Sequence, residues 1–170
     1  MDLRAVDASY RRVLIPTVPF LLAASLIGCS SSSRTSDVTE RAGALTSLRR
    51  TVLAKARSYI GTPYSPGGTT RGGMDCSGFV STVYLSAGIN LPRTAAAMYT
   101  VGKPVPRGKI KPGDLVFFRD TAGPGITHVA IALDAESFIH SSTTLGVIVS
   151  RFDETYYARR FAGARNILGP

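Results

Sequence analysis

The sequence predicts an α+β domain in which helices come first and an antiparallel sheet follows. Apolar residues recur at helical spacing between residues 46 and 101, whereas short apolar runs separated by turn residues occupy residues 114–167. Helices grouped before strands are typical of an antiparallel sheet covered by helices, and not of the alternating order that builds a parallel sheet.

The first 28 residues have the pattern of an export signal. Three arginines precede an apolar run from Val13 to Gly28, which Pro16 and Pro19 interrupt. A run of this length is short for a membrane span but typical of a secretory signal. We therefore predict a signal peptide over residues 1–28, with a short transmembrane anchor as the alternative.

The apolar run ends in LIGC, residues 26–29, which resembles a bacterial lipobox. The resemblance implies cleavage before Cys29 and a lipid on its thiol. Because the chain has only two cysteines, Cys76 would then be the only free thiol of an exported protein. The polar run Ser30–Ser36 is low in complexity, so we predict that residues 29–45 are the lipidated cysteine and a flexible tether.

The formal net charge is +9, with a basic isoelectric point. A basic exported domain favours an anionic neighbourhood, such as wall polymer or phospholipid head groups. The cations are scattered along the chain, whereas a nucleic-acid reader usually carries them in one stripe, so we expect no nucleic acid. The two cysteines and two histidines give no convincing zinc spacing, and we expect neither a metal nor a cofactor.

The predicted domain spans residues 46–170. Helical spacing over residues 46–60 predicts a first helix that ends at Gly61. A glycine-rich loop then leads to Cys76, where a second helix is predicted to begin, and a third, short helix is expected over residues 94–101.

The second half of the domain predicts strands. The expected strands are residues 114–118, 128–133, 137–141, 146–152 and 162–167. His128 opens the second of these strands and His140 lies near the end of the third. A tight turn between adjacent antiparallel strands would place the two imidazole rings side by side.

Cys76 is the candidate nucleophile. A helix N-terminus stabilises a thiolate through its partial positive charge and free N–H groups. His128 and His140 supply a candidate base and a residue to orient it, which is the general arrangement of an activated nucleophile. The alternatives are a cysteine that fills the core and histidines that are merely structural.

Six segments are similar, in the same order, to the NlpC-type cysteine peptidase family of bacterial cell-wall hydrolases. They are GTPYSPGG (61–68), GMDCSGFV (73–80), GINLPRT (88–94), PGDLVFF (112–118), HVAIAL (128–133) and FIHSS (138–142). The similarity covers about residues 48–168. It implies a reduced papain-like fold in which the nucleophile lies at a helix N-terminus packed on the sheet.

The resemblance also implies a role for individual residues. Cys76 corresponds to the nucleophile, His128 to the base, and His140 to the polar residue that orients the base. Tyr64 corresponds to the tyrosine whose hydroxyl helps to bind the oxyanion. His128 would take the thiol proton largely in advance, which gives a thiolate–imidazolium pair.

The implied substrate is a peptidoglycan stem peptide, cleaved between D-glutamate and a diamino acid, usually diaminopimelate. Asp75 and Ser77 correspond to residues that line the peptide groove, and no metal is needed. The sequence departs from the family pattern at four positions where we expect the groove to change shape. These positions are Ser65, Pro66, Met74 and Met98.

We therefore predict a monomeric, lipid-anchored peptidoglycan hydrolase of the cell envelope. Ser30 follows the lipidated cysteine, which favours the periplasmic face of the outer membrane if the source is Gram-negative. The alternatives are a non-catalytic wall-binding lipoprotein on the same fold, and an amidase or acyltransferase that uses the same Cys–His site.

Overall fold

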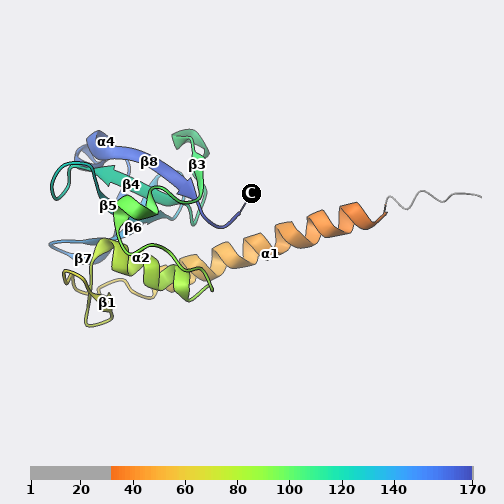
Figure 1. Cartoon of the computed structure of the whole chain (residues 1–170), viewed down its shortest axis with the longest axis horizontal. Helices are drawn as coiled ribbons and strands as arrows, with labels where there is room; N and C mark the ends of the chain where they lie inside the picture. Colours follow the sequence, from red (N-terminus) through yellow and green to blue (C-terminus); the bar gives the residue numbers. More distant parts are fainter. Residues whose placement is uncertain (1–31, 170) are drawn as a thin grey trace, which may run out of the picture.

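The computed structural model describes residues 32–169, so the predicted signal peptide and Cys29 lie outside the described residues. The elements in chain order are α1 (Ser32–Arg57), β1 (Thr69–Thr70), β2 (Gly73–Met74), α2 (Cys76–Leu85), α3 (Ala95–Met98), β3 (Lys103–Val105), the 3₁₀ turn η1 (Arg107–Lys109), β4 (Leu115–Arg119), β5 (Ile126–Ala132), β6 (Ser137–Ser142), β7 (Gly146–Arg151), α4 (Thr155–Arg160) and β8 (Phe161–Asn166). Figure 1 shows α2 packed beside the sheet and α1 projecting from the body of the domain.

The main sheet has six strands in the order β3-β8-β4-β5-β6-β7, and every neighbouring pair is antiparallel. The predicted α+β fold class is thus confirmed, and each of the five predicted strands is present with its bounds shifted by at most two residues. The short strands β1, β2 and β3 and the helix α4 were not predicted. They lack the length and the apolar periodicity on which a sequence pattern depends.

The start of the first helix was predicted wrongly. The helix begins at Ser32 and not near residue 46, so residues 32–45, expected to be a flexible tether, are helical. Residues 37–45 contain good helix formers, and Arg41 pairs with Asp37 one turn earlier at 3.2 Å. The helix then gains its tertiary support further along, where Leu45 and Leu48 pack against the core.

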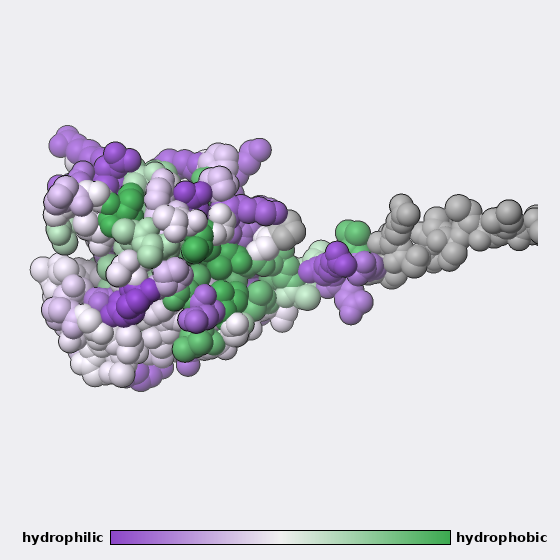
Figure 2. Space-filling view, viewed as in Figure 1, coloured by the Kyte–Doolittle hydropathy of each residue, from purple (hydrophilic) through white to green (hydrophobic). Residues whose placement is uncertain are grey.

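The C-terminal half of α1 fixes the helix to the domain. Val52 and Ala56 are fully buried, and Arg49 makes an ion pair with the buried Asp114 at 3.1 Å. Toward its N-terminus the same helix leaves the body, and Figure 2 shows apolar surface at that junction, where Leu45 lies close to Leu168. Within residues 32–169, no helix combines the length and the hydropathy that a membrane span requires.

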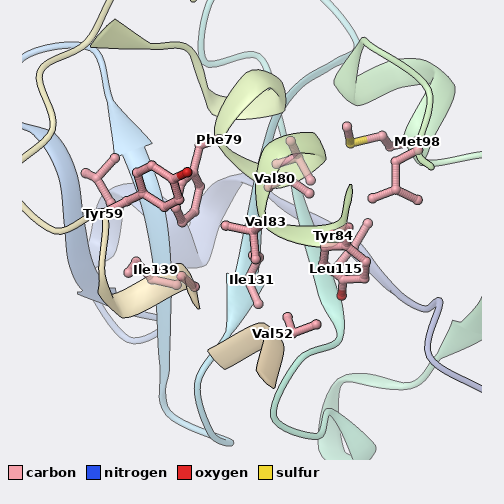
Figure 3. Close-up of a cluster of buried hydrophobic side chains, with 14 of the residues drawn as sticks. Val52, Tyr59, Phe79, Val80, Val83, Tyr84, Met98, Leu115, Ile131 and Ile139 are labelled. Atoms are coloured by element: carbon pink, nitrogen blue, oxygen red, sulfur yellow. The ribbon is translucent and has the colours of Figure 1, made fainter. Parts of the chain in front are cut away.

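The sheet has a core on each face. On the helical side, α2 inserts Phe79 and Val83 against Ile131 and Ile139 of the sheet, as the close-up in Figure 3 shows. On the other face, Phe118 and Phe138 pack with ring centroids 5.0 Å apart. The short helix α4 covers this second core and adds Tyr157, whose ring lies 5.0 Å from that of Phe138.

The β5–β6 turn is held by Asp134. Its carboxylate accepts hydrogen bonds from the backbone N–H groups of Glu136 and Ser137, at 2.8 and 2.7 Å. Such a turn is the side-chain equivalent of a backbone β-turn and keeps the connection short. It sets the two strands that carry His128 and His140 next to each other.

Candidate active site

Cys76 is the first residue of α2, as the sequence predicts. Asp75 caps this helix because its carboxylate accepts a hydrogen bond from the Gly78 N–H at 2.6 Å. A Cβ at Gly78 would lie 2.1 Å from the Gly68 carbonyl oxygen, so the preceding loop can pack against the helix start only with glycine there. Cys76 is half-buried, and its Sγ lies 3.9 Å from the Thr127 carbonyl oxygen.

His128 and His140 lie side by side. His128 Nε2 is 2.9 Å from His140 Nδ1, and the two rings are nearly perpendicular, with an interplanar angle of 83°. Both side chains are buried against the aromatic core of the second face, where Phe118 neighbours His128 and Phe138 neighbours His140. Because Nε2 of His128 is hydrogen-bonded to His140, Nδ1 is the nitrogen of His128 that can accept the proton of the Cys76 thiol.

The expected thiolate–imidazolium pair does not agree with the burial of the site. Burial raises the pKa of the Cys76 thiol, and the neighbouring Asp75 charge raises it further, although backbone N–H groups oppose the change. Burial also lowers the pKa of His128 to about 4. Desolvation disfavours both charged forms and outweighs the opposing backbone hydrogen bonds at Cys76, which favours a neutral thiol and a neutral imidazole in the free site.

Tyr64 lies beside Cys76, as the sequence predicts. Its ring borders two cavities, and Cys76 also lines both of them. Burial raises the pKa of Tyr64, and the nearby Asp75 charge adds to this effect. The phenol therefore keeps its proton at neutral pH and can donate a hydrogen bond toward the space in front of the thiol.

Asp75 and Ser77 line one of these two cavities, the one that the histidines do not border. The Asp75 carboxylate already accepts several hydrogen bonds. It receives hydrogen bonds from Gly67 N–H, Gly78 N–H, Ser77 Oγ and both terminal nitrogens of Arg93, at 2.6–3.1 Å. Burial alone would raise the pKa of Asp75, but these hydrogen bonds and the Arg93 charge hold it below its ordinary value. Asp75 thus holds the cap, the loop and Arg93 together at the wall of the cavity.

Arg93 was not selected from the sequence. Its half-exposed guanidinium donates hydrogen bonds to Asp75 and to Ser77 Oγ. It therefore places a cation beside the cavity that these two residues line. The available signal was its position in the GINLPRT segment, between the second and third predicted helices. Nothing local to that segment indicates that the arginine turns toward the start of α2.

Cys76 separates two cavities of similar size. The first has a volume of about 290 Å³, and the second about 320 Å³. Both histidines line the first, and its other walls are rich in hydroxyl groups, from Thr121, Thr127, Ser142, Thr143, Thr144, Tyr156 and Tyr157. Across residues 32–169, no group of three or more histidine, cysteine or acidic side chains is arranged to hold a metal ion.

None of the four departures from the family pattern borders either cavity. Met74 and Met98 are fully buried in the helical-side core, and neither borders either cavity. Neither residue lines the groove, and each flexible thioether fills core space in place of another apolar group. Ser65 and Pro66 lie in the loop before α2 and border neither cavity.

Comparison with known proteins gives consistent matches. The model of the NlpC/P60 family matches residues 61–166. A probable endopeptidase NlpC homolog of Haemophilus influenzae is 40% identical over 111 residues, which cover 65% of this chain and 58% of the relative. Murein DD-endopeptidase MepS/murein LD-carboxypeptidase of Escherichia coli is 37% identical over 122 residues, which cover 71% of this chain and 64% of the relative.

A solved structure agrees with the fold. The crystal structure of an NlpC/P60 family protein from Bacillus cereus superposes with a TM-score of 0.67 at 32% identity, over 71% of this chain and 40% of that one. The chain spans less than two thirds of the length of these two curated relatives.

Proposed function

Because this chain belongs to the NlpC/P60 family, we propose that it hydrolyses amide bonds of peptidoglycan stem peptides with Cys76 as nucleophile. The observation that carries the proposal is the meeting of three groups at one cavity: the Cys76 thiol at a helix N-terminus, the His128–His140 pair and the Tyr64 hydroxyl. A cysteine, a base and a residue that orients the base form the general arrangement for nucleophilic catalysis.

The reaction starts from the neutral pair. Cys76 Sγ attacks the carbonyl carbon while its proton passes to Nδ1 of His128. The Tyr64 hydroxyl and the Cys76 N–H then stabilise the oxyanion, and His128 returns the proton to the leaving amine. Water hydrolyses the thioester in a second step, in which His128 takes a proton from the water and the thiol is restored.

The positions of the two cavities suggest which side of the substrate each one binds. The leaving amine has to lie near His128, so the cavity lined by the histidines would take the leaving-group side. The cavity lined by Asp75 and Ser77 would then take the acyl side, and the Arg93 cation, which pairs with Asp75, lies beside that cavity. A free α-carboxylate on the acyl residue, as in γ-linked D-glutamate, would suit that cation.

The leaving-group cavity supports the same assignment. Its walls offer many hydroxyl groups, and none of its lining residues is acidic, lysine or arginine. Hydroxyl groups can bond both the ammonium and the carboxylate of a diamino acid. We therefore propose cleavage between D-glutamate and the diamino acid, whereas the name of the E. coli relative suggests the D,D cross-link as the competing bond.

The place of action is part of the proposal. The LIGC segment supports lipid attachment at Cys29, and α1 would then connect the anchor to the domain. The enzyme would act in the cell envelope, held at a membrane surface, and on the periplasmic face of the outer membrane if the source is Gram-negative.

Digestion of purified peptidoglycan, followed by mass analysis of the products, tests the proposal. Cleavage after D-glutamate releases fragments that begin with the diamino acid, whereas cleavage of cross-links only converts dimers to monomers. Products joined to an added amine would indicate acyl transfer. Binding to the polymer without any new product would support the non-catalytic alternative.

A further inference from the structure

Two hydroxyl groups lie at the outer nitrogen of His140. His140 Nε2 is 3.2 Å from Ser150 Oγ of β7 and 3.3 Å from Tyr157 Oη of α4. His140 is only 1% exposed and Ser150 only 6%, so bulk water has little access to this nitrogen. The protonation of His140 Nε2 is therefore decided by these two hydroxyl groups.

The tautomer of His140 controls the tautomer of His128. Each neutral imidazole has one N–H and one bare nitrogen. If His140 carries its proton on Nε2, its bare Nδ1 accepts a hydrogen bond from His128 Nε2–H, and His128 Nδ1 is free to take the thiol proton. If His140 carries its proton on Nδ1, the bond reverses and His128 Nδ1 is already protonated.

The hydroxyl groups favour the first arrangement. One N–H can be shared by two oxygen acceptors, whereas a bare Nε2 has one lone pair and could serve only one of the two hydroxyl groups that lie at 3.2 and 3.3 Å. Tyr157 also lines the first cavity, so its own hydrogen can turn into that space while its oxygen accepts from His140. An acceptor at Nε2 stabilises the tautomer that carries the proton there.

We propose that Ser150 and Tyr157 are positioning residues that hold His140 in its Nε2–H tautomer and thereby keep Nδ1 of His128 bare and ready for the thiol proton of Cys76. Only the catalytic benefit rests on the proposed function. The tautomers belong to the resting protein and can be measured without a substrate.

Nitrogen NMR of the untagged protein, labelled at histidine, tests the proposal directly. The chain has only two histidines, so the spectrum contains only two rings. At neutral pH we expect protonated Nε2 and bare Nδ1 in both rings. Observation of a protonated Nδ1 on either ring of the wild type would overturn the proposal.

Substitution of Tyr157 supplies the perturbation. Tyr157→Phe keeps the ring that packs against Phe118 and Phe138 but removes Oη. One of the two acceptors at His140 Nε2 is then lost, so we expect both rings to shift toward the Nδ1–H tautomer. Tyr99→Phe is the matched control, since the Tyr99 hydroxyl donates to the Ala162 carbonyl and packs elsewhere, against Phe117. Unchanged tautomers in Tyr157→Phe would refute the role.

Kinetics on a stem peptide add a second readout. We expect Ser150→Ala to lower kcat by about tenfold to a hundredfold with little change in KM, on the scale found when outer partners of metal-ligating histidines are removed. Tyr157→Phe should lower kcat to a similar extent and also raise KM, because Tyr157 lines the leaving-group cavity. In a His140→Asn background, which has no Nε2, either substitution should have no further effect on kcat. An equal loss in both backgrounds would indicate a merely structural role.

If no substrate is hydrolysed at all, the proposed function fails, and the NMR result still decides the tautomers.

Discussion

The two buried histidines should make the domain sensitive to acid between pH 7 and pH 4. Burial lowers the pKa of His128 from 6.5 to about 4, and burial together with the neighbouring His128 lowers the pKa of His140 from 6.5 to about 3. As the pH falls below 6.5, the two histidines take up protons in the unfolded chain, while in the folded domain they stay neutral. The stability that depends on neutral histidines is therefore complete above that value and is lost as the pH falls toward the folded pKa.

The size of the loss follows from the same values. Each pH unit below 6.5 lowers the free energy of unfolding by about 1.4 kcal/mol for each histidine that stays neutral, so each loses about 3 kcal/mol by pH 4. The two rings are in contact, so their effects need not add. Even a single loss of this size is a large part of the roughly 5–15 kcal/mol that stabilises a typical domain.

Urea unfolding at pH 7 and pH 4 measures the effect, with His140→Asn as the comparison. We expect the urea midpoint of the wild type to fall by about 1–3 M. The variant should lose much less between the two pH values, because one of the two titrating groups is absent. Acidic side chains contribute equally to both proteins, so they cancel in the comparison. Equal losses in the wild type and the variant would refute the burial argument.

Further predictions concern the anchor, the thiol, the orienting histidine and the cap. Cys29→Ser should abolish incorporation of labelled palmitate by the expressed full chain, and an unlabelled wild type would defeat the lipobox assignment. Alkylation of Cys76 in the free enzyme should be slow at pH 6 and should rise only above the ordinary thiol pKa, whereas fast, pH-independent alkylation would reveal a preformed thiolate. His140→Asn should keep much more kcat/KM than His140→Ala, because an amide oxygen can still accept from His128, and the alanine loss should be about tenfold to ten-thousandfold; near-wild-type values for both would remove His140 from the site. Asp75→Ala should lower the free energy of unfolding by about 1 kcal/mol or more through loss of the helix cap, measurable by thermal melting, and an unchanged melting temperature would contradict that role.

The parts of the site that could be predicted from sequence are those fixed by local pattern. Cys76 follows a capping aspartate and begins an apolar helix, so its place at a helix start could be inferred. The proximity of His128 and His140 followed from two strands joined by a short turn, which Asp134 stabilises. In each case the signal lies within about 15 residues of chain.

The parts that could not be predicted depend on contacts between distant segments. Ser150 meets His140 only through the register of β6 and β7, and Tyr157 reaches it from a helix of six residues that has no periodic signal. Arg93 turns toward Asp75 across a loop. The direction of the Cys76 pKa shift was also predicted wrongly, because burial by the whole fold raises the pKa against the local effect of the backbone N–H groups.

The most direct test of the account is a comparison of wild type and Cys76→Ala on purified peptidoglycan, with the free energy of unfolding measured for both. Loss of the thiol is sterically mild at a helix start, so the variant should keep the fold and its affinity for the polymer. It should release no stem-peptide fragments, whereas the wild type releases them and forms a thioester that acid quenching traps on Cys76. A folded Cys76→Ala protein that digests peptidoglycan like the wild type would contradict the account.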